Sequence, residues 1–189
     1  MMSKAQMLLK EIIFVHHPDF VGQAHTQKIV YAGADWVNTE RLIEHTMAHV
    51  GGYNFIDGDH EDFDDGTDSK TASVRLNPVP KGSQQGHILE ISGIGRGGAG
   101  GSLKKGALRV VLYNPVAQRL DYFFIPKAAW AGMLKYHPTS GIAKIVATWN
   151  SKTDTCNKLD PFKVSSFEEL ARMPACPATQ PAVIVRRFA

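Results

Sequence analysis

Helical spacing of apolar residues identifies four segments of this chain. Apolar positions recur every three or four residues over 3–15, which predicts a short amphipathic helix. A second helix is predicted from about residue 38 to residue 50, where two glycines end it. Two further helices are predicted over residues 126–136, with a proline at the start, and over residues 167–173.

Other segments predict strands, either by alternation of apolar and polar residues, as in 67–76, or as short apolar runs. Strands are expected at residues 53–56, 67–76, 87–92, 108–113, 120–125, 142–149 and 182–188. The segment 19–36 is ambiguous, with a short strand possible at 28–31. The chain shows no repeat and no linker, so residues 1–189 are expected to form one α/β domain. A central mixed β-sheet would be flanked by helices.

Composition places the chain among ordinary globular proteins. It has 189 residues, of which 43% are hydrophobic and 21% charged. No apolar run approaches the ~20 residues that cross a bilayer, so we expect no membrane partner. The early apolar run is too short for a signal peptide, and two cysteines suit a reducing compartment. We therefore expect a cytoplasmic protein.

The charge distribution is uneven, although the net charge is only +3. Seven of the 18 acidic residues lie between Asp57 and Asp68, with no lysine or arginine among them. The rest of the chain has 21 basic and 11 acidic residues and therefore carries +10. A basic body around one acidic focus suits a polyanionic substrate that meets a bound cation.

The acidic segment also carries a turn signal. Asp65-Gly66 predicts a two-residue hairpin turn between the arms 61–64 and 67–76. In that hairpin Phe63 would pair with Asp68, and Asp62 would lie opposite Ser69. Asp68 and Lys70 would project from the same face of the second arm.

These residue types suit phosphodiester hydrolysis. Carboxylates hold Mg²⁺, which lowers the pKa of a bound water and polarises the phosphoryl group. A lysine ammonium stabilises the extra negative charge or orients the nucleophile. We expect Asp62 and Asp68 to bind the metal, with the Ser69 carbonyl as a further ligand and Lys70 as the catalytic cation. Asp57 and Asp59 are alternatives to Asp62 as the first ligand.

On these residues the chain resembles the PD-(D/E)XK nuclease superfamily, which includes most type II restriction endonucleases. The similar features are Asp62, the run Asp68-Ser69-Lys70 with the strand after it, and the preceding helix that begins with Glu40. The resemblance spans roughly residues 38–136, mostly as architecture. It implies a restriction-endonuclease-like fold, Mg²⁺ as cofactor and Glu40 as a further catalytic, metal-binding acid.

The expected substrate is double-stranded DNA. Readers of a short palindromic site would work as a homodimer. The glycine-rich segment 93–106 has seven glycines and is expected to be a mobile, unpacked loop that contacts phosphates. The candidate DNA-binding residues are Arg75, Lys81, Arg96, Lys104 and Lys105.

Two other functions remain open at this point. One is a DNase of the same chemistry that serves in repair or as a toxin. The other is a non-catalytic, basic nucleic-acid-binding protein whose acidic hairpin binds a structural cation such as Ca²⁺. The sequence does not distinguish them from a restriction enzyme.

Overall fold

A computed structural model describes residues 4–16, 35–56, 61–76, 86–98 and 101–175 of the chain. For Gln6 and for residues 35–40 it describes the backbone alone. The ambiguous segment 19–36 therefore lies largely outside the described residues, as does the expected strand 182–188. None of the described helices is long and apolar enough to cross a membrane.

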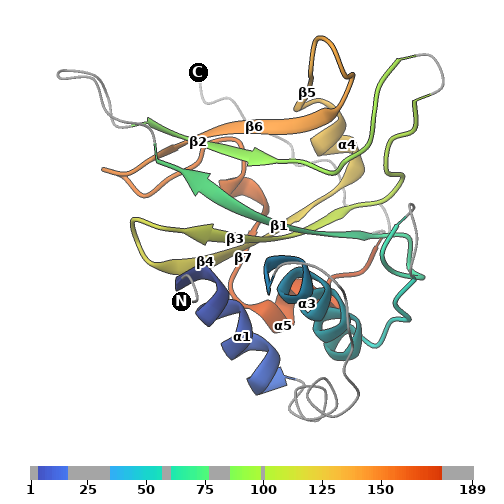
Figure 1. The fold of residues 1–189 in the computed structure, drawn as a ribbon, viewed down its shortest axis with the longest axis vertical. Coiled ribbons are helices and arrows are strands. Elements are labelled where there is room, and N and C mark those ends of the chain that lie inside the picture. Colours follow the sequence, from blue (N-terminus) through green and yellow to red (C-terminus); the bar gives the residue numbers. More distant parts are fainter. Residues whose placement is uncertain (1–3, 17–34, 57–60, 77–85, 99–100, 176–189) are drawn as a thin grey trace, which may run out of the picture.

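The chain forms a single α/β domain built on a mixed sheet of seven strands, as expected (Figure 1). The strands are β1 (Asp68–Arg75), β2 (Gly86–Ile91), β3 (Leu108–Asn114), β4 (Arg119–Ile125), β5 (Leu134–Tyr136), β6 (Ala143–Asn150) and β7 (Lys163–Val164). The helices are α1 (Lys4–His16), α3 (Asp35–Gly51), α4 (Lys127–Ala131) and α5 (Phe167–Arg172), with a 3₁₀ turn at Asp160–Phe162.

The strands lie in the order β5-β6-β2-β1-β3-β4-β7. Strands β1 and β3 are parallel, and each of the other neighbouring pairs is antiparallel. The β1–β2 pairing is short, because its register covers Val74 with Leu89 and Arg75 with Ile88. Figure 1 shows the consequence: the β5-β6-β2 half of the sheet diverges from the β3-β4-β7 half.

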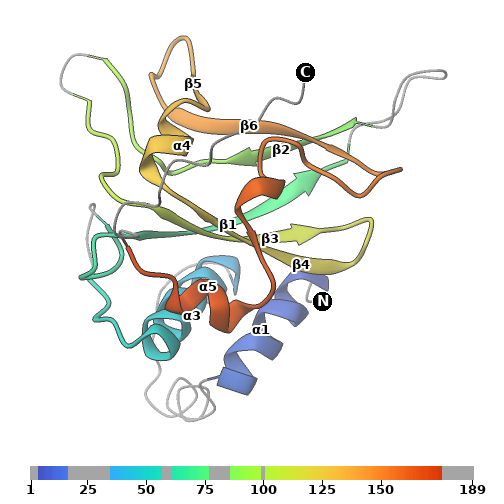
Figure 2. The ribbon, with the colours of Figure 1, turned by 180° about the vertical axis from the view of Figure 1, so that it is seen from behind.

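Two hydrophobic cores cover the two faces of the central strands. Strand β3 is buried on both faces, since Val110 and Leu112 enter one core while Val111 enters the other. The first core fills the space between the diverging halves of the sheet and includes Trp130 of α4. The second core lies under α1, α3 and α5, which gather on one face (Figure 2). Burial on both faces explains the nearly continuous apolar sequence of β3.

Two predicted elements differ from the structure. The helix expected over 126–136 ends at Ala131, and Leu134–Tyr136 forms β5 instead, paired with β6. Antiparallel pairing with β6, the next strand along the chain, outweighs the local helical pattern there. No strand forms at 53–56 in the described chain, although Phe55 makes one isolated bridge with Phe63.

The glycine-rich segment is packed where it is described, which makes the expectation of an unpacked loop wrong. Ile94 is fully buried in the first core. Gly95 forms a bridge with Leu103, and Arg96 forms one with Ile142 beside β6. A side chain at Gly95 would lie 2.2 Å from the carbonyl oxygen of Ser102, so glycine here permits two backbones to approach closely. The segment is therefore a fixed wall beside β1.

Candidate active site

The acidic residues meet at an open edge of β1. From Asp68 to Ser73, β1 pairs with β3 on one side. Its pairing with β2 on the other side includes Val74 and Arg75 and no earlier residue. Backbone groups and side chains in the first half of β1 therefore remain available to residues outside the sheet.

Asp62 occupies this open edge with its side chain. Its Oδ2 accepts a hydrogen bond of 2.8 Å from the backbone N–H of Ser69, in the place that a neighbouring strand would take. Asp62 therefore lies beside Ser69 through a side-chain hydrogen bond, and not through the strand pairing that was predicted. Asp62 is buried, and its proximity to Asp68 is set by this bond to the adjacent residue.

The predicted hairpin pairing that led to this placement is wrong. Phe63 pairs with Phe55 and not with Asp68, and its N–H donates to the Thr67 carbonyl at 3.2 Å. The Asp65 carboxylate accepts hydrogen bonds from the N–H and hydroxyl of Thr67 at 3.0 and 2.6 Å. This side-chain capping produces a wider turn than a two-residue hairpin loop.

Asp68 and Lys70 lie on the same face of β1, as alternation predicts. Lys70 Nζ contacts Asp68 Oδ2, lies 3.9 Å from Asp62 Oδ2 and donates to the Ser69 carbonyl at 2.8 Å. The Lys70 stem passes beside Gly93, where an added Cβ would lie 3.4 Å from Lys70 Cε. One ammonium therefore lies between two carboxylates, in a position restricted by the wall 93–98.

Asp68 is the least hydrated of these groups. Its side chain is fully buried, and the partners of its two oxygens are the ammonium groups of Lys70 and Lys104. Burial raises the pKa of Asp68 to about 6, and the nearby Asp62 charge adds to the rise, whereas Lys70 and Lys104 lower it. A buried carboxylate with a raised pKa is a candidate functional group, because perturbed pKa values concentrate at such sites.

Lys104 brings a second ammonium to the same carboxylate. Its Nζ lies 2.9 Å from Asp68 Oδ1, on the opposite oxygen from Lys70. Its backbone N–H donates to the Ile94 carbonyl at 2.9 Å, which fixes it to the glycine-rich wall. The sequence predicted Lys104 as a phosphate contact and gave no sign of this pairing, since 36 positions separate the two residues.

Helix α3 brings an acid to the site that the sequence analysis did not name. Glu40 lies in α3, but its side chain is outside the described part of the chain. Glu44, one turn later, is half-buried, and burial raises its pKa against the effect of Arg41, at 3.2 Å. The charges of Lys70 and Asp68 also act on Glu44. The sequence signal that could have identified it is its place beside Ile43 on the buried face of α3.

Arg109 holds the acidic turn in position. It is fully buried on β3, and its Nη2 donates to Asp65 Oδ2 at 2.9 Å, to the Tyr53 hydroxyl at 2.9 Å and to the Met173 carbonyl. Its Nε donates to the Leu170 carbonyl of α5 at 3.2 Å. The guanidinium thus ties the turn between Asp62 and Asp68 to α5, a role that the sequence did not reveal.

The other candidate DNA-binding residues that the structure describes are Arg75, Arg96 and Lys105. Arg75 is seven residues from Asp68 along β1, roughly 23 Å at ~3.3 Å per residue, and pairs with Glu90 at 3.8 Å. Arg96 and Lys105 are exposed on the wall segment. Lys105 donates its backbone N–H to Glu61 at 2.6 Å, so its segment is tied to the acidic one. Lys81 lies outside the described residues.

The donor set fits a cation that keeps part of its own hydration. Among the described residues, no three His, Cys, Asp or Glu side chains converge on one point. The Ser69 N–H holds Asp62 beside Asp68, and the Ser69 carbonyl, which follows Asp68 in the chain, accepts a hydrogen bond from Lys70. Mg²⁺ is commonly held by one or two carboxylates, with waters and substrate phosphates completing its octahedron. Asp57 and Asp59 lie outside the described residues.

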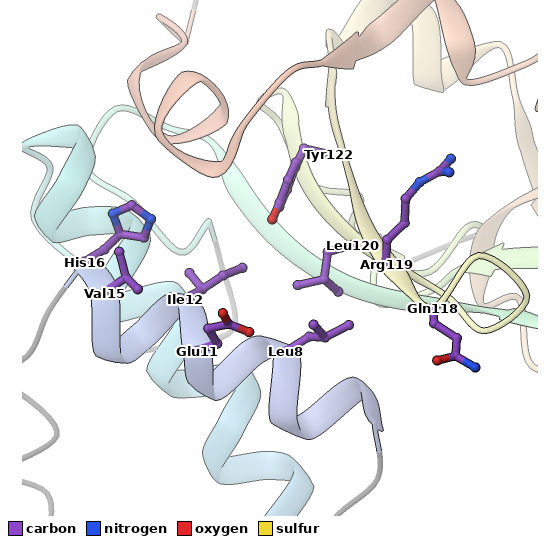
Figure 3. A pocket seen from close by; sticks show the side chains of 9 residues that line it. All are labelled: Leu8, Glu11, Ile12, Val15, His16, Gln118, Arg119, Leu120 and Tyr122. Atoms are coloured by element: carbon purple, nitrogen blue, oxygen red, sulfur yellow. The ribbon is translucent and has the colours of Figure 1, made fainter.

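Two of the cavities among the described residues have no lining residue in common. One of about 560 Å³ adjoins the acidic turn and is lined by residues including Asp65, Lys105 and Lys127. The other, of about 290 Å³, lies between α1 and β4 and is drawn in Figure 3. There the Tyr122 ring extends toward α1, and burial raises its pKa to about 12, so the hydroxyl is uncharged. The smaller cavity shares no residue with the acidic cluster.

Comparison with known proteins gives no family for this chain. No protein-family model matches it, and no curated protein matches it. Inference about function therefore depends on the geometry of the acidic cluster.

Proposed function

We propose that this protein is a Mg²⁺-dependent endonuclease that hydrolyses double-stranded DNA, most specifically a type II restriction endonuclease. The observation that supports this is the meeting of Asp62, Asp68 and Lys70 at the open edge of β1. Both Asp68 oxygens are buried there, and the ammonium groups of Lys70 and Lys104 contact them. Burial raises the pKa of Asp68, and carboxylates perturbed in this way concentrate at functional sites.

Asp62 and Asp68 would hold the Mg²⁺, with the Ser69 carbonyl as a further ligand. The bound Mg²⁺ would polarise the phosphoryl group and lower the pKa of a coordinated water. Asp62 is held for this role by the Ser69 N–H, which donates to its Oδ2. Asp68 would contribute whichever oxygen faces the ion.

Lys70 would orient the attacking water or stabilise the negative charge that develops on the phosphorus oxygens. Its ammonium lies beside both carboxylates, and its stem is restricted by Gly93. Glu44 would not bind the Mg²⁺ itself, and its negative charge would act on Lys70 and Asp68. A fixed ammonium contributes more than a freely moving one, because its orientation is established before the reaction.

Double-stranded DNA is the polyanion that best suits the excess positive charge outside the acidic segment. Exposed Arg96 and Lys105 lie on the wall that borders the site and would contact phosphates. A palindromic site would be read by a homodimer with two-fold symmetry.

The test is digestion of plasmid DNA by the purified protein with Mg²⁺ and with EDTA, beside Asp68→Ala. We expect discrete Mg²⁺-dependent fragments that disappear in the variant. A smear would favour a repair or toxin nuclease over a restriction enzyme. Intact plasmid at protein excess, across several buffers and DNA sources, would refute nuclease activity.

Lys70→Ala separates catalysis from binding. A nuclease is expected to lose cleavage in this variant while it keeps most of its DNA affinity, measured by fluorescence anisotropy. A non-catalytic binding protein with a cation-stabilised turn would show no cleavage in either form. In that case the acidic cluster would affect thermal stability in Ca²⁺ but not DNA chemistry.

A further inference from the structure

Asp68 is contacted by two ammonium groups, and the proposed chemistry uses one of them. Lys70 approaches Oδ2, while Lys104 lies 2.9 Å from Oδ1. Their side chains are 16% and 13% exposed, so both are held in the site rather than extended into solvent. The second lysine therefore occupies the one Asp68 oxygen that Lys70 leaves open.

The charges of this cluster balance without any metal. Asp62 and Asp68 contribute two negative charges, and Lys70 and Lys104 contribute two positive charges. A divalent cation placed on the two carboxylates would give a net charge of +2 at a buried point. Like charges in a site of low dielectric repel strongly, so the cation and the Lys104 ammonium are alternatives at Asp68 Oδ1.

Lys104 can leave Asp68 without any movement of the backbone. The Ile94 carbonyl accepts a hydrogen bond from its N–H, and Leu103 forms a bridge with Gly95. Close contact of Gly106 with Gly66 fixes the segment on its other side. The lysine stem, in contrast, has four rotatable bonds, and its ammonium can turn from the carboxylate toward a phosphate at the mouth of the site.

We propose that Lys104 is an exchangeable cation: it neutralises Asp68 in the metal-free site, yields that oxygen to the divalent cation, and then pairs with the DNA phosphate. This inference rests on the proposed nuclease function. Binding of the divalent cation and binding of DNA would then be coupled. The cation releases the Lys104 ammonium, and the DNA phosphate attracts it. By linkage, DNA would raise metal affinity by the same factor as metal raises DNA affinity.

The test measures the affinity for Mn²⁺ alone, from the EPR signal of free Mn²⁺, for wild type and three variants at Lys104 or Lys105. We expect Lys104→Met to bind Mn²⁺ about tenfold more tightly than wild type, within the usual range of coupling between sites. Lys104→Arg keeps the cation and should resemble wild type. Lys105→Met removes an exposed charge from the same segment and should leave Mn²⁺ affinity unchanged.

The outcomes separate this inference from the function on which it rests. Equal affinities in wild type and Lys104→Met, both abolished by Asp68→Asn, would overturn the exchange and leave the metal site standing. An equal gain in Lys105→Met would also overturn it, because the effect would then be one of overall charge. Absence of Mn²⁺ binding in both wild type and Lys104→Met would refute the exchange and the metal site together. Binding by Lys104→Met alone, lost on Asp68→Asn, would support it.

Discussion

Asp65 and Asp68 lie three residues apart in one acidic run, yet their surroundings are opposite. Asp65 Oδ1 accepts hydrogen bonds from the N–H and hydroxyl of Thr67, and Oδ2 accepts one from Arg109. Asp68 is more deeply buried, and its oxygens are contacted by lysine ammonium groups instead of backbone N–H, hydroxyl or guanidinium donors. Fixed donors at Asp65 stabilise the turn, whereas the partners of Asp68 are the ends of flexible side chains.

The same difference applies to their cations. Arg109 is fully buried, and its planar guanidinium donates in several fixed directions. Asp68 is paired with two lysines, whose flexible stems let the ammonium groups move. The rigid pair Asp65–Arg109 would then hold the turn in place, whereas the pairs that Asp68 forms with lysines could be exchanged for a ligand. Each contrast can be tested by a matched pair of variants.

The largest expected effect is on cleavage. Asp68→Asn should reduce Mg²⁺-dependent plasmid cleavage about a thousandfold or more, because it removes a charged ligand from the cation. Its free energy of unfolding at pH 7 should not fall. Burial raises the pKa of Asp68, so the folded state favours the neutral form that asparagine imitates. Urea titration checks this second expectation, and a large loss of stability would show that Asp68 stabilises the fold as Asp65 does.

Variants of Arg109 and Asp65 should lower the free energy of unfolding. Arg109→Met leaves Asp65 without its guanidinium partner and should lower the free energy of unfolding by about 3–5 kcal/mol. Asp65→Asn should also destabilise, since it leaves Arg109 with an uncompensated buried charge. The double variant should lose less than the sum of the two, which urea titration of the four proteins measures. Strict additivity would mean that the two groups do not stabilise each other.

A smaller effect is expected where the wall meets the acidic turn. A Cβ at Gly106 would lie 1.7 Å from the Gly66 carbonyl oxygen, so Gly106→Ala must displace one of the two backbones. We expect a loss of about 1–3 kcal/mol, as for other overpacked sites, together with weaker cleavage. Gly132→Ala is the matched control, because its Cβ would meet its nearest atom at 3.6 Å. Thermal melting of both variants compares them, and equal losses would contradict the close contact.

Local patterns predicted most of the sheet and few of the contacts within the site. Strands β1 to β4 and β6 lie within two residues of their predicted bounds, because alternating patterns and short apolar runs both report burial in a sheet. The short strand β5 was missed, because three residues are too few to show a pattern. The packing of segment 93–98 was missed because Ile94 enters a core whose other residues are distant in the sequence.

Within the site, prediction succeeded for neighbours and failed for distant partners. Asp62 and Asp68 both lie near the Lys70 ammonium in space. Their closeness in sequence was enough to predict this, even though the assumed hairpin pairing was wrong. Lys104 and Arg109 reach the acidic segment through the tertiary fold, and no spacing rule connects them to it. The choice between Glu40 and Glu44 depends on how α3 packs on the sheet, which helical periodicity does not determine.

The pH dependence of Mn²⁺ binding tests whether Asp68 is a metal ligand, and the expected effect is smaller than those above. A proton and a cation compete for Asp68, whose pKa is raised to about 6 by burial. Mn²⁺ affinity should therefore be nearly constant above pH 7 and fall about tenfold per pH unit below 6. EPR titrations from pH 5 to 8 measure it. Constant affinity down to pH 5 would show that Asp68 is not a ligand.

The smallest expected effect belongs to Glu44, which acts on the cluster through its charge alone. Glu44→Gln should weaken Mn²⁺ binding about two- to fivefold, the range of a partly screened charge interaction. The matched control is Glu11→Gln, which removes the same charge from exposed α1 beside the cavity of Figure 3. An equal, small loss in both variants would indicate a general field effect. A loss of a hundredfold or more in Glu44→Gln would instead make Glu44 a direct ligand and add a third carboxylate to Asp62 and Asp68.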